Sequence, residues 1–272
     1  MAKENFYIGY LPSAPKPLKR FLSRFVWLTI PILLVFAVSL VLYQKDYVTS
    51  TFEIGQLSTI EGMLTYEPVP MLKVPLGKND QGKEQYQSVL LVDFGKKGAE
   101  ESLRKIEATH GALEGKSLTL EGTLIYYDGK SLLEMTKSEN AFVKVEGGSL
   151  ASQTKIIGKV NLRGEIADPK CYFGVMKPGE GKPHRSCAAR CIAGGIPPVF
   201  KVEQNGTVDY YLVKGAGGKA IYEELFSIIA ERVSLEGQAY QVDDWKVIEI
   251  DDLSEIKRLS QGGLPNPPMC SF

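Results

Sequence analysis

The sequence lacks the features by which many soluble proteins are assigned to a function class. Basic and acidic residues both number 32, so no global charge favours nucleic acid as a partner. No G-x-S-x-G, H-E-x-x-H or phosphate-loop motif is present, and these are the patterns typical of serine hydrolases, zinc proteases and nucleotide-binding proteins. There is also no C-x-x-C-H motif for covalent haem. These absences favour a protein without enzymatic activity of its own, and they leave the identity of any small-molecule substrate unknown.

Charge is missing from one long run of the chain. Residues 25–43 read FVWLTIPILLVFAVSLVLY, nineteen residues without a charged side chain, which is enough to cross a hydrocarbon core of roughly 30 Å. The run is longer than the apolar core of a signal peptide, and no small-x-small cleavage site follows it. Pro31 is tolerated in a membrane-spanning helix. The sequence therefore predicts an uncleaved transmembrane helix over residues 25–43.

The two flanks of this run differ in charge. Residues 1–24 contain five basic residues and one acidic residue, whereas Lys45 and Asp46 cancel on the other side. Because the more basic flank usually stays in the cytoplasm, we expect residues 1–24 to be cytoplasmic and the C-terminal domains to be extracytoplasmic. The expected location is the inner (plasma) membrane of a bacterium, crossed once, with periplasmic domains. Disulfide bonds persist in that compartment.

The part of the chain after the apolar run repeats itself. Residues 120–135 read LEGTLIYYDGKSLLEM, and residues 235–250 read LEGQAYQVDDWKVIEI. The two segments align without a gap at an offset of 115 residues, and each has the pattern of a strand, a tight turn and a second strand. Asp128-Gly129 is a strong hairpin signal. Glu134 and the other carboxylates of these hairpins are expected at turns and on solvent-facing surfaces.

Each copy of this hairpin follows a similar set of elements. An early strand with a central glycine, Gly62 in the first half and Gly164 in the second, precedes two further strands and an amphipathic segment. The amphipathic segments predict helices over residues 99–109 and 220–231. Five strands interrupted by one helix before the last hairpin are typical of a small OB-type barrel, and a glycine suits the sharp bend of its first strand.

The sequence thus predicts a mainly β fold, in which the single transmembrane helix is followed by two tandem OB-like β-barrels, each with one helix. The barrels are expected over residues 50–146 and 156–255, with Gly147-Gly148-Ser149 in the linker and residues 256–272 as a tail. OB barrels often bind oligonucleotides, but such sites use basic grooves with stacking aromatic side chains. In a near-neutral extracytoplasmic protein we expect no nucleic-acid binding.

The halves differ in an insertion at residues 171–198 of the second barrel. It holds three of the four cysteines and one of the two histidines. A helix is predicted to begin near His184 and to end at Gly194-Gly195, because glycine commonly follows the last helical turn. On that helix His184, Cys187 and Cys191 have i, i+3, i+7 spacing and share one face.

These residues are candidate metal ligands. Cys171 ends the preceding strand and can fold back across a Gly- and Pro-rich loop, so the full set is Cys171, His184, Cys187 and Cys191. Three cysteines with one histidine are a known zinc set, and thiolates also suit Cu(I) or an iron–sulfur cluster. Met176 is an additional candidate ligand. The sequence therefore predicts a metal ion or redox centre in the insertion.

The same cysteines allow two other interpretations. A disulfide from Cys171 to Cys187 or Cys191, or between the last two, would staple the insertion and stabilise the fold by about 2–4 kcal/mol. A redox-active pair would instead make the protein a thiol–disulfide oxidoreductase. Cys270, in the tail, completes an even count of four and is expected to lie outside the centre.

Residues 168–200 contain, in order, Cys-Tyr, a gap, His-x-x-Cys-Ala-x-x-Cys and Gly-x-Pro. This pattern resembles a motif of small uncharacterised bacterial exported proteins, and the resemblance implies a recurring unit without a defined chemistry. We therefore expect a membrane-anchored extracytoplasmic accessory protein with a Cys/His metal or redox centre, acting as a subunit or protein partner of a bacterial membrane redox complex. The alternatives are a non-catalytic interaction module made rigid by disulfides, and a thiol–disulfide oxidoreductase.

Overall fold

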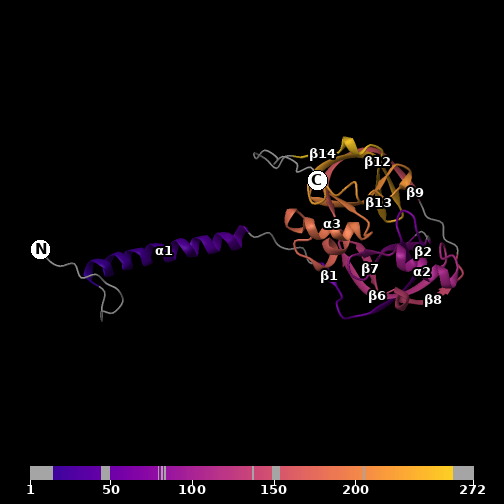
Figure 1. Cartoon of the computed structure of the whole chain (residues 1–272), viewed down its shortest axis with the longest axis horizontal. Coiled ribbons are helices and arrows are strands. Elements are labelled where there is room, and N and C mark those ends of the chain that lie inside the picture. Colours follow the sequence, from indigo (N-terminus) through magenta and orange to yellow (C-terminus); the bar gives the residue numbers. More distant parts are fainter. Residues whose placement is uncertain are drawn as a thin grey trace. The chain divides into compact units, whose positions relative to one another are not determined.

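The computed structural model describes residues 15–43, 50–78, 80, 82, 84–136, 138–148, 154–204 and 206–259. The chain consists of two compact units, residues 1–48 and 49–272 (Figure 1). The first fourteen residues, Ser149 of the expected linker, and Cys270 with most of the expected tail lie outside the described residues.

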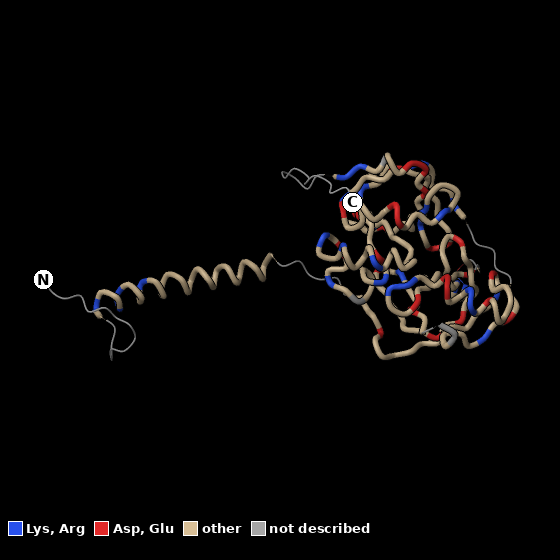
Figure 2. The backbone as a smooth tube through the Cα atoms, in the orientation of Figure 1, with Lys and Arg blue, Asp and Glu red and all other residues tan. Residues whose placement is uncertain are grey.

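The first unit contains α1, a helix of 28 residues from Lys16 to Tyr43 with no buried side chain. At 1.5 Å per residue it is about 42 Å long, more than a hydrocarbon core of roughly 30 Å. Figure 2 shows its basic residues at the N-terminal end and uncharged residues along the remainder. Among the described residues, α1 is the helix that is long and apolar enough to cross a membrane. An anchor and a signal sequence both fit this helix, so its orientation stays a prediction.

The first half of the globular unit is an eight-stranded sheet with a closed circuit of five strands. β2 pairs with β3, β3 with β4, β7 with β6 and β6 with β2 in antiparallel register, and β4 pairs with β7 in parallel register. The strands are β1 (Thr51–Phe52), β2 (Ser58–Thr65), β3 (Met71–Lys78), β4 (Glu84–Asp93), β5 (Lys97–Gly98), β6 (Ser117–Tyr127), β7 (Lys130–Met135) and β8 (Phe142–Glu146). The expected helix of this half is present as α2 (Glu100–His110), which buries Leu103 and Ile106.

The second half is a six-stranded sheet that also closes on itself. β9 pairs with β10, β10 with β11, β13 with β12 and β12 with β9 in antiparallel register, and β11 pairs with β13 in parallel register. The strands are β9 (Thr154–Ala167), β10 (Val199–Gln204), β11 (Thr207–Gly215), β12 (Arg232–Val242), β13 (Trp245–Ile250) and β14 (Lys257–Arg258). The pairing order within the five-stranded circuit is therefore the same in both halves.

The helix predicted over residues 220–231 is not formed. The segment is a series of turns, and Ala230 has a φ of 60°, which lies outside the right-handed helical region. Its apolar side chains at positions 221, 225, 228 and 229 are still buried. Ile229 also forms a bridge with Ile166 of β9, so contact with the sheet competes with helix formation. The described helix of this half is instead α3 (Arg185–Ala193), which lies in the insertion.

Both predicted hairpins are confirmed. β6 and β7 are joined by a two-residue turn at Asp128-Gly129, whose φ values are 49° and 73°. β12 and β13 are joined at the equivalent Asp243-Asp244, where Asp243 has a φ of 52°. Positive φ values at such turns match the right-handed twist of the flanking strands.

Close backbone packing accounts for the glycine of the repeated Leu-Glu-Gly segment. A Cβ atom on Gly122 would lie 2.4 Å from the carbonyl oxygen of Glu134, and one on Gly237 would lie 2.3 Å from that of Glu249. Within each hairpin the second strand therefore lies too close for any side chain at this position. This contact explains why the glycine recurs at the same place in both halves.

A shared apolar cluster joins the two closed sheets. It includes Ile125 from the first sheet, Tyr210 and Trp245 from the second, and Phe173 from the insertion. The Phe173 ring lies edge-on to Tyr210 and Trp245, with centroid distances of 4.9 and 6.4 Å, a favoured aromatic geometry. The Trp245 indole N–H donates to the carbonyl oxygen of Ser88 at 3.3 Å. The insertion thus begins inside the contact between the two sheets.

Candidate metal centre

The three cysteines of the insertion converge at this contact. Cys171 begins a single wide helical turn, Cys171–Val175, shortly after β9. Cys187 and Cys191 lie one turn apart on α3, where residues four apart share a face. All three Sγ atoms lie within 4.8 Å of one another. Cys171, Cys187 and Cys191 are called the three-cysteine cluster below.

Close packing against the first half fixes the end of α3. The backbone N–H of Gly98 donates to the carbonyl oxygen of Gly194 at 2.9 Å. A Cβ atom on Gly194 would lie 1.8 Å from the carbonyl oxygen of Lys96, so no other residue fits there without a backbone shift. The glycines that end the helix in the sequence therefore also let α3 reach the first half.

The three-cysteine cluster contains no disulfide bond. The sulfurs of Cys171 and Cys187 are 3.9 Å apart, whereas a disulfide bond measures about 2.05 Å. Ligand sulfurs around a tetrahedral ion with bonds of about 2.3 Å are about 3.8 Å apart. The cysteine staple considered from the sequence is thus absent from the cluster, and the sulfur spacing fits a bound metal ion.

His184 lies outside the three-cysteine cluster. It belongs to the short 3-10 turn Lys182–His184 that precedes α3, so the one-face spacing of a continuous helix does not apply to it. One of its ring nitrogens lies within 4.8 Å of both Cys171 Sγ and a carboxylate oxygen of Asp168. The structure therefore arranges the candidate ligands in two sets that share Cys171.

Asp168 is the residue of this region that sequence reasoning missed. It follows β9 directly, is fully buried, and accepts a hydrogen bond from the Lys170 backbone N–H at Oδ1, at 2.9 Å. The signal was an acidic residue three positions before a cysteine, but an Asp-Pro pair is equally typical of a turn. Met176, the additional candidate, lines the same cleft as the three-cysteine cluster. Cys270 lies outside the described residues.

The charged groups near the cluster differ from one cysteine to another. Lys96 donates a hydrogen bond from Nζ to the Cys187 sulfur at 3.1 Å, and this bond raises the pKa of Lys96. The pKa of the Cys171 thiol is also raised, first by its hydrogen bond with Cys191, then by burial, and further by the negative charge of Asp168. A buried thiol in such a place ionises when a cation supplies the compensating positive charge.

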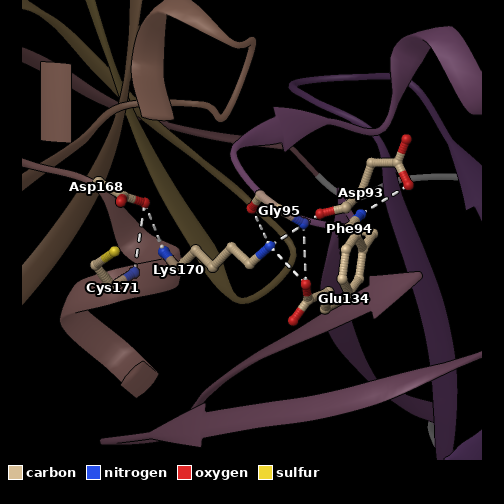
Figure 3. A network of polar contacts seen from close by, with 7 residues as sticks. All are labelled: Asp93, Phe94, Gly95, Glu134, Asp168, Lys170 and Cys171. Atoms are coloured by element: carbon tan, nitrogen blue, oxygen red, sulfur yellow. Dashed lines mark hydrogen bonds and ion pairs between the residues drawn. The ribbon is translucent and has the colours of Figure 1, made fainter. Parts of the chain in front are cut away.

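A buried lysine ties this region to the first half (Figure 3). Lys170 Nζ donates to the carbonyl oxygens of Asp93 and Gly95, at 2.9 and 2.5 Å, and to Glu134 Oε1 at 2.9 Å. Glu134, expected on a solvent-facing surface, is therefore buried in an ion pair between the halves. Because Lys170 directly precedes Cys171, this contact also positions the first cysteine of the cluster.

A cleft of about 730 Å³ opens at the three-cysteine cluster. Its lining includes the Lys96 side chain and the exposed apolar side chains of Ile54, Leu57, Phe94 and Met176. The fold and site together describe a mainly β chain with a long apolar N-terminal helix, in which a cleft is lined by three cysteines that can hold a metal ion.

Comparisons with known proteins add no family to this description. No family model matches the chain, and no curated protein matches it. Among solved structures, the tetrameric p202 HIN2 is 8% identical with a TM-score of 0.20, over 80% of this chain and 100% of that chain. A deletion mutant of the single-stranded DNA binding protein from Thermus aquaticus is 14% identical with a TM-score of 0.21, over 80% and 91%. At these TM-scores neither likeness carries an argument about this chain.

Proposed function

We propose that this protein is a membrane-anchored, extracytoplasmic accessory protein that holds a metal ion on its three-cysteine cluster. The observation that supports the proposal best is the convergence of three cysteines without a disulfide bond in the lining of one cleft. In this proposal α1 is the anchor, with its basic N-terminal end in the cytoplasm. The two closed sheets are tandem OB-like barrels of a duplicated domain, supported by the same pairing order and by equivalent hairpins.

The ligand chemistry favours a soft or borderline ion. Three thiolates suit Zn²⁺ or Cu(I), whereas an iron–sulfur cluster ordinarily needs a fourth cysteine, and the described residues contain three. A fourth coordination position would face the cleft, where Met176 and outside ligands have access. An ion in this position would be reachable by a partner or a small molecule, as in sites that keep one position open.

The rim of the cleft supports a protein partner. Ile54, Leu57 and Phe94 are large apolar side chains that line the cleft and are exposed. Grouped apolar side chains of this kind often mark interaction surfaces. The role we propose is therefore that of a subunit or partner of a membrane redox complex, which contacts the protein around the metal ion.

A second candidate function is thiol–disulfide exchange. The 3.9 Å separation of the Cys171 and Cys187 sulfurs would allow a disulfide to form after a small movement, and Lys96 contacts the Cys187 sulfur. An oxidoreductase of this type would carry no metal, and its cysteines would cycle between free thiols and a disulfide.

Metal analysis of the full chain, purified anaerobically in detergent, together with a count of reactive thiols tests the proposal. We expect bound zinc or copper and cluster thiols that react after chelation, because a metal-bound thiolate is protected. Cys191→Ser should abolish binding at the cluster, whereas the matched Cys270→Ser should retain it. A metal-free chain with freely reacting thiols, or with a disulfide among the three cysteines, would contradict the proposal and favour the second candidate.

A further inference from the structure

A second group of donor atoms lies behind the three-cysteine cluster. One carboxylate oxygen of Asp168, the sulfur of Cys171 and one ring nitrogen of His184 all lie within 4.8 Å of one another. Asp168 is 0% exposed and His184 is 3% exposed. Neither residue lines the cleft, whereas Cys171 does. Cys171 therefore stands between the cleft and a fully enclosed pair of polar side chains.

Both enclosed side chains contain a polar atom without a partner. Asp168 Oδ2 and His184 Nε2 are buried and form no hydrogen bond. Leaving one such atom unsatisfied in the interior costs about 1–3 kcal/mol, more for a charged group, so native proteins rarely do so without a functional reason. A carboxylate oxygen, an imidazole nitrogen and a thiolate are all donors to a metal ion.

A single ion cannot use all of these donors. A tetrahedral ion takes four ligands, and the five candidate residues form two sets of three with Cys171 in common. The donor geometry thus resembles two adjacent sites that share one sulfur.

We propose that the protein binds a second divalent cation through Asp168, Cys171 and His184, and that the Cys171 thiolate bridges it to the ion on the three-cysteine cluster. This inference rests on the proposed function, because Cys171 belongs to both sites. A mixed carboxylate, thiolate and imidazole set suits Zn²⁺, and Co²⁺ as its probe.

Charge balance supports two ions rather than one. Three thiolates and one carboxylate carry four negative charges, and the exposed Lys96, whose Nζ donates to the Cys187 sulfur, supplies one positive charge beside them. A single ion would leave the deprotonated set with uncompensated buried charge, which proteins avoid. The positive charge of Lys170 is not free for this role, because Glu134 pairs with it. The second ion would also be enclosed, so it should exchange more slowly than the ion that faces the cleft.

The stoichiometry of Zn²⁺ and Co²⁺ in the full chain tests this inference. We expect two ions per native chain. Asp168→Asn and His184→Gln should each reduce the count to one ion per chain. Asn at position 168 keeps a side-chain oxygen that can accept the hydrogen bond from the Lys170 backbone N–H. Cys187→Ser should remove the cleft ion and leave the enclosed one. Circular dichroism of each variant confirms that it has folded.

Release of Co²⁺ to a chelator from the native chain provides a second measurement that needs no variant. Two phases of equal amplitude are expected, the faster one from the ion that faces the cleft and the slower one from the enclosed ion. One ion per native chain, retained after Asp168→Asn and His184→Gln and released in one phase, would overturn the second site while leaving the proposed function intact. A native chain without any bound ion would overturn both.

Discussion

Replacing Lys170 by Met removes the buried cation that ties the second half of the globular unit to the first. The lysine ammonium donates three hydrogen bonds, to Asp93 O, Gly95 O and Glu134 Oε1. The side chains of Lys170 and Glu134 are 6% and 10% exposed, so water cannot replace the lost partner. Met keeps most of the aliphatic length, and the change therefore isolates the charge.

The expected loss of unfolding free energy is about 3–5 kcal/mol, the usual result when one partner of a buried ion pair is removed. The Glu134 carboxylate would still accept the hydrogen bond from the Gly95 backbone N–H, at 3.2 Å. It would no longer have a positively charged partner. Domains of this kind have a total stability of about 5–15 kcal/mol. The corresponding fall in Tm is about 6–20 °C for a folded unit of this size.

Urea unfolding of the full chain in detergent, followed by tryptophan fluorescence, measures this loss. The sequence contains two tryptophans, and a Trp27→Phe background leaves Trp245, which is fully buried, as the reporter of the globular unit. Adding Glu134→Leu to Lys170→Met should recover much of the stability, because no unpaired charge then remains.

Lys105→Met is the matched control. Lys105 pairs with Glu101 at 2.9 Å, but the two side chains are 47% and 57% exposed, and exposed pairs of this spacing contribute about 0.3–0.5 kcal/mol. If Lys170→Met destabilises the protein no more than Lys105→Met does, the buried pair does not hold the two halves together and the reasoning is refuted.

Three further predictions follow from local features. Gly122→Ala and Gly237→Ala should each lower the unfolding free energy by about 1–3 kcal/mol, because the new Cβ would overlap a backbone carbonyl. Gly147→Ala, with nothing within 4 Å of its Cβ position, should be close to neutral in the same urea assay, and equal effects at all three positions would count against the packing argument. Burial raises the pKa of Glu100 above its usual 4.5, so the folded chain binds more protons than the unfolded chain above that pH. The contribution of Glu100 to the free energy of unfolding therefore falls as the pH rises from 4.5 through the raised pKa of the folded state. Glu100→Gln should flatten that part of the stability profile, and an unchanged profile would show that Glu100 titrates normally. An alkaline phosphatase fusion at the C-terminus should be active, whereas an active cytoplasmic reporter at the same place would reverse the expected orientation.

Features encoded by neighbouring residues could be predicted from the sequence. The apolar helix follows from a run without charges, and the two hairpins follow from turn residues between alternating strands. The insertion was recognised because cysteines gather in one of two otherwise similar halves. Each of these signals can be read from the order of residues along the chain, so no knowledge of the tertiary structure was needed.

The distant contacts could not be predicted in the same way. The segment over residues 220–231 has helical spacing, but its burial against β9 selects turns instead. Glu134 was expected on a solvent-facing surface, and the sequence gives no sign of its partner Lys170, because only the packing of the two closed sheets brings them together.

The division of the candidate metal ligands into two sets also depends on tertiary contacts. The sequence by itself determined that Cys171, Cys187, Cys191 and His184 belong to one insertion. Tertiary structure decided that the three sulfurs form one set and that His184 joins Asp168 and Cys171 in another. The physical reason is that α3 begins one residue after His184, so the histidine leaves the helical face on which Cys187 and Cys191 lie, and its direction is set by the buried surroundings rather than by helical spacing.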